Sequence, residues 1–218
     1  MATLEYLNEG GRPQRVDEAN GLPVRLPGSL SVLSRDYLWK AVAEGRVFIS
    51  ADADQNDVVT GQTSFANTTP TFLLDVPAGT VAVPLFANIS QAGTVAGDVV
   101  SVVIEMDKVK RHASGGTAEK IANARTTPAV NAKCVLYSTA TAAAGYGINL
   151  WAAQIGQDVS PAEGAVQGPF WRPEIPYQLV GPATLLIYAY AGTTGPTIWW
   201  SIGWMEMSID EANLIARL

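Results

Sequence analysis

The sequence is poor in the residues that carry most enzyme chemistry. Among its 218 residues there is one cysteine, Cys134, and one histidine, His112. A single cysteine excludes an intrachain disulfide and a cysteine-rich metal site. No GxSxG surrounds a serine, no GxGxxG follows a predicted strand, and no phosphate-binding GxxxxGK[ST] is present. We therefore expect no catalytic residue, no cofactor and no metal ligand, and we expect Cys134 to be a buried, inert thiol.

Charge is also scarce. Charged residues make up 16% of the chain and the formal net charge is −6, whereas about a quarter of residues are charged in an average protein. The acidic balance argues against nonspecific binding to nucleic acid. Low charge favours a protein that buries surface against copies of itself or a partner, although a large core has the same effect.

Long apolar runs are missing as well. No run reaches the roughly 18 residues of a membrane-spanning helix, and the first residues, MATLEYLNEGG, lack the basic and apolar regions of a signal peptide. We expect a protein made in a cytoplasm, with no membrane partner.

What the sequence does contain is a series of short strand-like runs. They are rich in Val, Ile, Leu and aromatic residues, and turns separate them at the spacing of sandwiches and barrels. Pro84 inside one run indicates an edge strand or a bulge. The runs span 46–52, 58–65, 70–76, 80–90, 98–109, 133–144 and 146–156. These runs predict one antiparallel β-sandwich domain over residues 34–218.

Residues 175–208 stand out as a predicted C-terminal hairpin. Its two runs, 183–191 and 197–207, flank the turn AGTTGP. In the second run both alternating faces are apolar, so the outer face needs a cover: a helix, the N-terminal region or another subunit. Trp199 and Met205 on that face are therefore candidate subunit-interface residues.

Residues 1–33, rich in proline and glycine, are expected to form an extended N-terminal arm or a disordered tail. Leu22, Val24 and Leu26 alternate there and could add an edge strand to a neighbouring subunit, so they are further interface candidates.

Two short helices are expected. The first spans residues 34–45, with Ser34 as the N-cap and Gly45 in the left-handed position after the helix. The second follows Ser208, which forms a capping-box pattern with Glu211.

Residues 108–133 are basic and contain six of the fourteen lysines and arginines. The segment is either a basic contact to an acidic partner surface or to DNA, or a solvated, mobile connection. The candidate contact residues are Lys108, Lys110, Arg111, Lys120 and Arg125.

Acidic residues give two weak signals. The turn 52–57 starts with EF-hand spacing but lacks the required glycine and glutamate, so we expect a solvated turn. Glycoside hydrolysis needs only two facing carboxylates, and four acids lie on or beside predicted strands, yet no pattern pairs any two of them. They are Glu105, Asp107, Glu174 and Glu206, the last of which we expect to face outward.

Two aromatic residues in loops are candidates for ligand binding. Trp171 and Tyr146 could stack on a sugar. Trp171 could equally pin its long loop onto the sheet.

Two segments carry a resemblance to a known family. VDEANGLPVRL (16–26) and the closing IPYQLVGPATLLIYAYAG…TIWWSIGWMEM resemble jelly-roll structural proteins of tailed-bacteriophage virions, especially head decoration (cement) proteins. The resemblance implies a jelly-roll-like sandwich and a non-enzymatic dimer or trimer on the capsid surface, bound to the major capsid protein or other virion proteins. The alternative is a carbohydrate- or receptor-binding jelly-roll module of a phage tail or fibre.

Overall fold

The computed structural model describes residues 5–7, 13–15, 30–52, 58–92, 99–127, 130–155, 170–192 and 195–215. The chain divides into two units, residues 1–38 and 39–218. In the first unit, β1 (Glu5–Leu7) and β2 (Pro13–Arg15) pair antiparallel. Leu22, Val24 and Leu26, and residues 53–57 of the acidic turn, lie outside the described residues.

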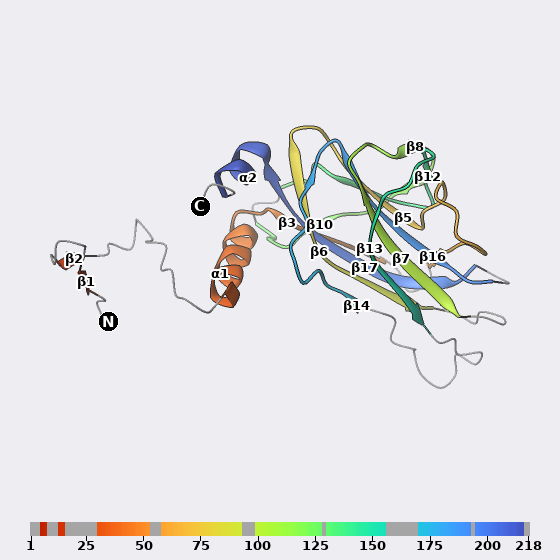
Figure 1. The fold of residues 1–218 in the computed structure, drawn as a ribbon, viewed down its shortest axis with the longest axis horizontal. Helices are drawn as coiled ribbons and strands as arrows, with labels where there is room; N and C mark the ends of the chain where they lie inside the picture. Colours follow the sequence, from red (N-terminus) through yellow and green to blue (C-terminus); the bar gives the residue numbers. More distant parts are fainter. Residues whose placement is uncertain are drawn as a thin grey trace. The chain divides into compact units, whose positions relative to one another are not determined.

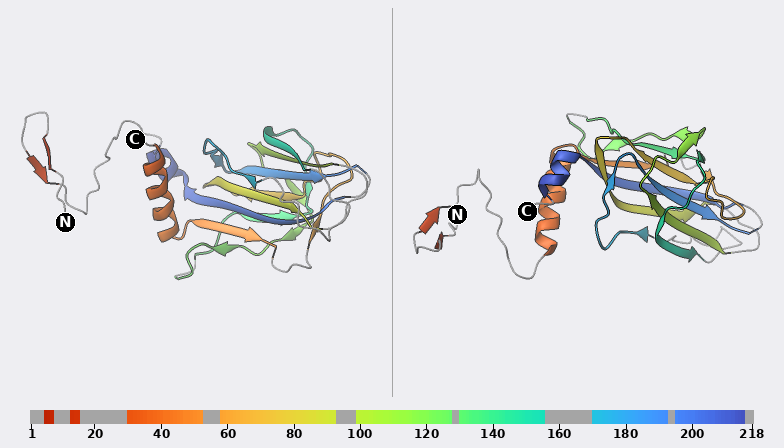
Figure 2. Two further views of the ribbon diagram at one scale, coloured as in Figure 1. Left: turned by 90° about the horizontal axis from the view of Figure 1, so that it is seen from below. Right: turned by 45° about the horizontal axis from the view of Figure 1, so that its top comes forward.

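The second unit is built on two antiparallel sheets (Figures 1 and 2). Eight strands form its framework, and they pair first with eighth, second with seventh, third with sixth and fourth with fifth. In chain order they are β3 (Val47–Ala51), β5 (Phe72–Val76), β6 (Thr80–Gln91), β7 (Val100–Asp107), β13 (Ile148–Ile155), β14 (Phe170–Trp171), β16 (Ala183–Tyr190) and β17 (Thr197–Ser208). This pairing is that of a long hairpin rolled into two sheets, which is the jelly roll. The predicted antiparallel sandwich is confirmed.

Shorter strands extend the two sheets. The seven-stranded sheet has the order β10-β3-β17-β6-β14, with β4 and β15 beside it, and the six-stranded sheet has the order β13-β7-β16-β5-β11-β9. The added strands are β4 (Val59–Thr60), β9 (Thr117–Ala118), β10 (Ala122–Asn123), β11 (Val135–Ser138) and β15 (Leu179–Val180), and β8 (His112–Ser114) pairs with β12 (Thr141–Ala142) apart from both sheets. Because β9 pairs with one sheet and β10 with the other, the segment between them closes one side of the sandwich.

The predicted C-terminal hairpin is wrong. Its two strands exist, but β16 lies in the six-stranded sheet and β17 in the seven-stranded sheet. Each is an inner strand with a neighbour on both sides, β7 and β5 for β16, and β3 and β6 for β17. Such apolar strands bury more surface between two neighbours within a sheet than beside one hairpin partner. The chain therefore passes from the six-stranded to the seven-stranded sheet between β16 and β17.

The core lies between the sheets and takes alternate residues from each strand. Ile198, Trp200, Ile202 and Trp204 of β17 are all buried there. Pro84 lies in an inner strand, and the register between β6 and β17 shifts beside it, so the bulge predicted at this proline is confirmed.

A second apolar cluster covers the outer face of the six-stranded sheet. Leu73, Leu186 and Tyr188 point outward from that sheet and pack against Ala142, which belongs to the insertion between β7 and β13. The chain thus supplies its own cover for β16.

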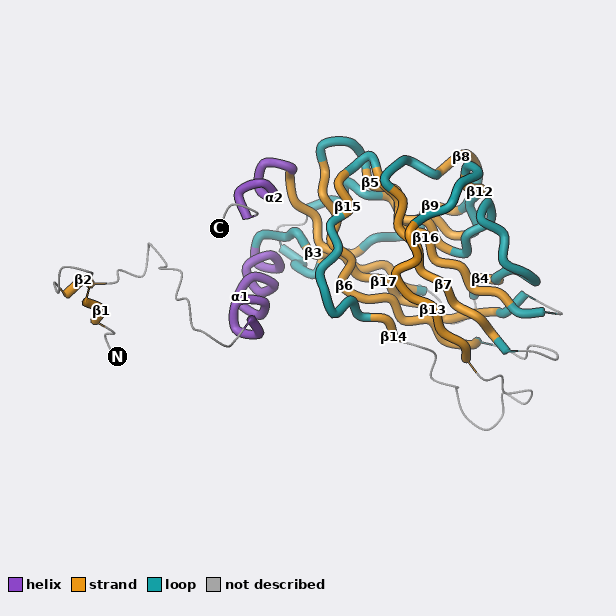
Figure 3. The backbone as a smooth tube through the Cα atoms, in the orientation of Figure 1, coloured by secondary structure: helices purple, strands orange, loops and turns teal. Residues whose placement is uncertain are grey.

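The two described helices are α1 (Leu30–Ala43) and α2 (Ile209–Ile215), which are purple in Figure 3. The first begins four residues before Ser34, so Ser34 lies inside the helix and is not its cap. Gly45 has φ of 72° and its N–H donates to Val42 O, while Arg46 N–H donates to Ala41 O, which is the expected glycine-based helix end. Among the described residues, no helix is long and apolar enough to cross a membrane.

Candidate interaction surface

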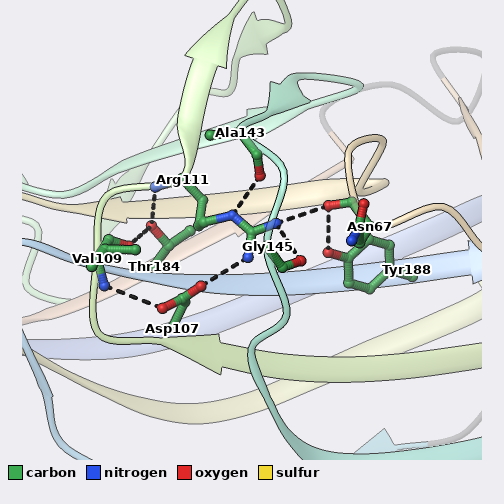
Figure 4. A network of polar contacts seen from close by, with 8 residues as sticks. All are labelled: Asn67, Asp107, Val109, Arg111, Ala143, Gly145, Thr184 and Tyr188. Atoms are coloured by element: carbon green, nitrogen blue, oxygen red, sulfur yellow. Dashed lines mark hydrogen bonds and ion pairs between the residues drawn. The ribbon is translucent and has the colours of Figure 1, made fainter.

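A buried arginine organises the insertion between β7 and β13 (Figure 4). The Arg111 side chain is 2% exposed and its Nη1 lies 2.8 Å from Asp107 Oδ2. Its other guanidinium N–H groups donate to backbone oxygens of Ala143 (2.6 Å), Gly145 (3.0 Å) and Asn67 (3.1 Å). A buried charge needs a counter-charge and satisfied donors, and this site supplies both. Arg111 therefore holds three segments together and is not a surface contact.

The backbone around Arg111 is held equally closely. Thr184 Oγ1 accepts from Arg111 N–H at 2.9 Å and donates to Val109 O at 3.0 Å. Tyr188, which lies on β16 together with Thr184, donates a hydrogen bond from its hydroxyl to Asn67 O at 3.1 Å. Burial, and then the charge of Glu105, raise the pKa of Tyr188 to about 12, so this hydroxyl remains a donor at physiological pH.

The other basic residues of the segment do not form one patch. Lys110 lies 3.1 Å from Asp75. Arg125 donates to the backbone oxygens of Ala43 and Thr127, and so fastens the end of α1. Lys108 and Lys120 are exposed, but Lys108 follows β7 of the six-stranded sheet and Lys120 precedes β10 of the seven-stranded sheet. The structure thus separates the five residues that the sequence groups together.

Glu206 faces inward, so the expected outward orientation is wrong. It is 6% exposed and accepts three hydrogen bonds, from the backbone N–H of Lys133 (2.8 Å) and of Cys134 (3.0 Å) and from Trp204 Nε1 (2.9 Å). Even-numbered residues of β17 face the core, and these donors allow a carboxylate to lie there. Burial, and then the charge of Glu206, raise the pKa of the Cys134 thiol. The predicted buried position of this cysteine is confirmed.

The remaining acids do not suggest a catalytic pair. Glu105 is 7% exposed on β7, and its Oε2 is buried with no hydrogen-bond partner. Asp107 is paired with Arg111, Glu174 is exposed in a loop, and Glu206 lies in the other sheet. Among the described residues no three His, Cys, Asp or Glu side chains are grouped as a metal site.

One uncharged, aromatic surface lies on the outer side of the seven-stranded sheet, and we call it the aromatic face. Its residues come from three adjacent strands and alternate with the core residues. They are Phe86, Asn88 and Ser90 of β6, Phe170 of β14, and Trp199, Ser201 and Gly203 of β17. Phe170 is 57% exposed and Trp199 is 37% exposed.

Glycine at position 203 lets the aromatic face close up. Phe86 stacks on Phe170 with ring centroids 6.0 Å apart and planes 20° apart. A Cβ on Gly203, which faces Phe86 across the strands, would lie 2.3 Å from Phe86 Cε1. Any larger residue at position 203 would therefore displace the Phe86 ring. The stacking of Phe86 on Phe170 thus depends on glycine at this position.

The structure places the other aromatic and apolar candidates differently. Trp171 is 4% exposed and belongs to the core, so the interpretation that it pins its loop is confirmed and its ring is not presented to a sugar. Tyr146 is 83% exposed. Met205 is 4% exposed, so the half of β17 that follows Gly203 is covered within the chain, whereas Trp199 remains accessible.

Sequence reasoning missed Phe86 and Phe170. In AVPLFANIS, Ala87 and Ile89 face the core, so alternation places Phe86 on the outer face of the sheet. This alternation was the signal from which Phe86 could have been identified. Comparison of the chain with protein-family models, with curated proteins and with solved structures gives no significant match.

Proposed function

We propose that the chain is a non-enzymatic structural protein of a phage particle, a decoration protein that binds the outer head surface and stabilises contacts between capsomers. The aromatic face is the observation that supports this most. It is uncharged, it presents two partly exposed aromatic rings, and its residues lie on paired strands. Side chains on strands are held more rigidly than those on loops, so less entropy is lost when a partner covers them.

The large side chains of the aromatic face fit a protein–protein interface. Large aromatic residues are the commonest anchors of protein interfaces, and full burial of one contributes about 1.5–3 kcal/mol. Trp199 and Phe170 are only partly exposed, so the gain for each is below that range. The partner is the major capsid protein or another virion protein, as the sequence resemblance implies.

The test is co-sedimentation with bare capsids. We expect the wild-type chain to sediment with them and the double variant Trp199→Ala with Phe170→Ala to lose most of this binding. Trp39→Ala is the matched control, because Trp39 is an aromatic residue of α1 that is 73% exposed and does not belong to the aromatic face. Circular dichroism establishes that all three chains are folded. If the wild-type chain fails to bind capsids at every salt concentration, or if the double variant binds as well as wild type, the proposal is wrong.

A second candidate is a carbohydrate-binding module of a tail or fibre. The observation in its favour is the stacked pair Phe86–Phe170 beside Asn88 and Ser201, because sugars are bound by aromatic planes flanked by amides and hydroxyls. A glycan array separates the two functions. Binding that is lost in Phe170→Ala, together with no binding to capsids, would favour this module.

A further inference from the structure

The edges of the two sheets differ sharply in length. The seven-stranded sheet ends at β10 and β14, and the six-stranded sheet ends at β9 and β13. Three of these strands have two residues each, whereas β13 has eight. Short edge strands protect a sheet from pairing with other chains, so β13 is the edge that is left available. Within the described part of the chain, it pairs only with β7.

The composition of β13 also lacks the usual protection. Its sequence, INLWAAQI, contains no charged residue and no proline. Lysine, proline, inward-pointing charges and β-bulges are the devices that normally prevent edge pairing. The one register shift of β13 lies between Asn149 and Trp151, and from Trp151 to Ile155 the strand pairs regularly with β7, so this part is a regular edge. Alternate residues of an edge strand direct N–H and C=O groups away from the sheet, and only another extended strand satisfies them in order.

Apolar side chains reinforce this edge. Ile148 is 50% exposed, and Tyr146, just before the strand, is 83% exposed. Leu150 and Trp151 pack on the core but are only partly buried. A strand laid beside β13 would cover these side chains as well as satisfy its backbone groups.

We infer that β13 pairs antiparallel with β13 of a second copy, which joins two six-stranded sheets across a two-fold axis. A second copy fits because the strand is uncharged while each chain carries a net charge of −6, so contact along β13 avoids like-charge pairs. It also fits because an isologous contact satisfies both edges with strands of equal length. This inference is independent of the proposed function.

Introducing charge at the edge tests the pairing. Ala152 and Gln154 are exposed on β13, and we expect A152K/Q154K to convert a wild-type dimer into a monomer by native mass spectrometry and sedimentation. The matched control, S114K/A124K, adds the same charge at exposed positions outside β13 and should remain a dimer. Unchanged circular dichroism shows that the variants are folded. A monomeric wild type, or an A152K/Q154K variant that remains a dimer, overturns the inference.

Cysteine cross-linking locates the axis. Because Cys134 is buried, one new exposed cysteine gives one accessible thiol per chain. Placed in turn at Asn149, Ala152 and Gln154, it should form a disulfide-linked dimer at the position nearest the axis, where the Cβ atoms of facing residues lie about 4.5–5.5 Å apart. Ser114→Cys is the control. If no β13 position cross-links faster than Ser114→Cys, β13 does not pair with itself. Any dimer seen by mass spectrometry is then held by an interface elsewhere or by another strand on this edge.

Discussion

Replacing Arg111 with methionine should destabilise the protein severely although it removes no residue from the core between the sheets. The methionine keeps much of the apolar stem, so the change isolates the guanidinium. That group pairs with Asp107 and donates to three backbone oxygens, and it is 2% exposed. Its loss leaves Asp107 without its cation and three carbonyls without this donor.

The magnitude follows from the burial. Breaking a buried ion pair by removing one partner costs about 3–5 kcal/mol. Asp107 is 16% exposed and can recover some hydration, so the lower end, about 3 kcal/mol, is the expected loss. For a chain of this size, about 1 kcal/mol corresponds to roughly 2–4 °C in Tm, so the melting temperature should fall by roughly 6–12 °C.

The assay is urea unfolding followed by circular dichroism, with thermal melting as a second measurement. Lys120→Met is the control, because Lys120 is an exposed cation in the same insertion and should change stability by less than about 0.5 kcal/mol. Arg111→Lys should also be destabilised, since an ammonium group cannot reach all four acceptors with the guanidinium geometry. The reasoning is refuted if Arg111→Met unfolds within about 0.5 kcal/mol of wild type.

Two further predictions concern a buried thiol and a helix cap. Cys134 should react with a thiol reagent only after unfolding, because burial and Glu206 keep the thiol protonated; rapid labelling of the native protein would contradict this. Ser208→Ala should cost about 1 kcal/mol at neutral pH, since Ser208 and Glu211 cap α2 reciprocally. The hydrogen bond from Ser208 N–H lowers the pKa of Glu211 from its ordinary value. Because this donor belongs to the backbone and persists in Ser208→Ala, its contribution is tested with Glu211→Gln. The contribution is complete above the unfolded-state pKa of Glu211 and is lost as the pH falls through the lower folded-state pKa, so the unfolding curves of wild type and Glu211→Gln should converge in acid. A difference between these two chains that stays constant down to low pH would contradict this prediction.

Sequence patterns located most of the local structure but not the pairing. Alternation located most of the framework strands, and residue preferences located Gly45 and the Ser208–Glu211 cap, whereas the start of α1 was wrongly placed at Ser34. Strand β16 pairs with β5, more than a hundred residues earlier in the chain, and alternation reports which faces are apolar but not which strand lies beside them. Two adjacent apolar runs joined by a turn therefore predict a hairpin that the structure does not form.

The buried charges of Glu206 and Arg111 show the same limit of sequence patterns, which do not identify partners that are distant in the chain. The alternation that places Trp204 in the core also places Glu206 there, but a carboxylate in a core is costly without donors. Two of its three donors are the backbone N–H groups of Lys133 and Cys134, more than seventy residues away in the chain. Arg111 likewise depends on carbonyls of distant loops. Such partners become known only from the three-dimensional structure.

The two proposed surfaces are compatible because they belong to different sheets. The aromatic face lies on the seven-stranded sheet, and β13 is the edge of the six-stranded sheet. Antiparallel pairing of two copies of β13 into one continuous sheet places the two-fold axis perpendicular to that sheet. A rotation about such an axis does not turn the sandwich over, so both aromatic faces would point to the same side of the dimer. A dimer of this form would meet a flat, repeating surface with two equivalent contacts. The second contact then forms at a high effective concentration, which can strengthen binding by about 10²–10⁴ without any new residue. Modest aromatic anchors on each copy would therefore suffice to hold the dimer on a capsid lattice, and the monomeric A152K/Q154K variant would lose that advantage with its aromatic face intact.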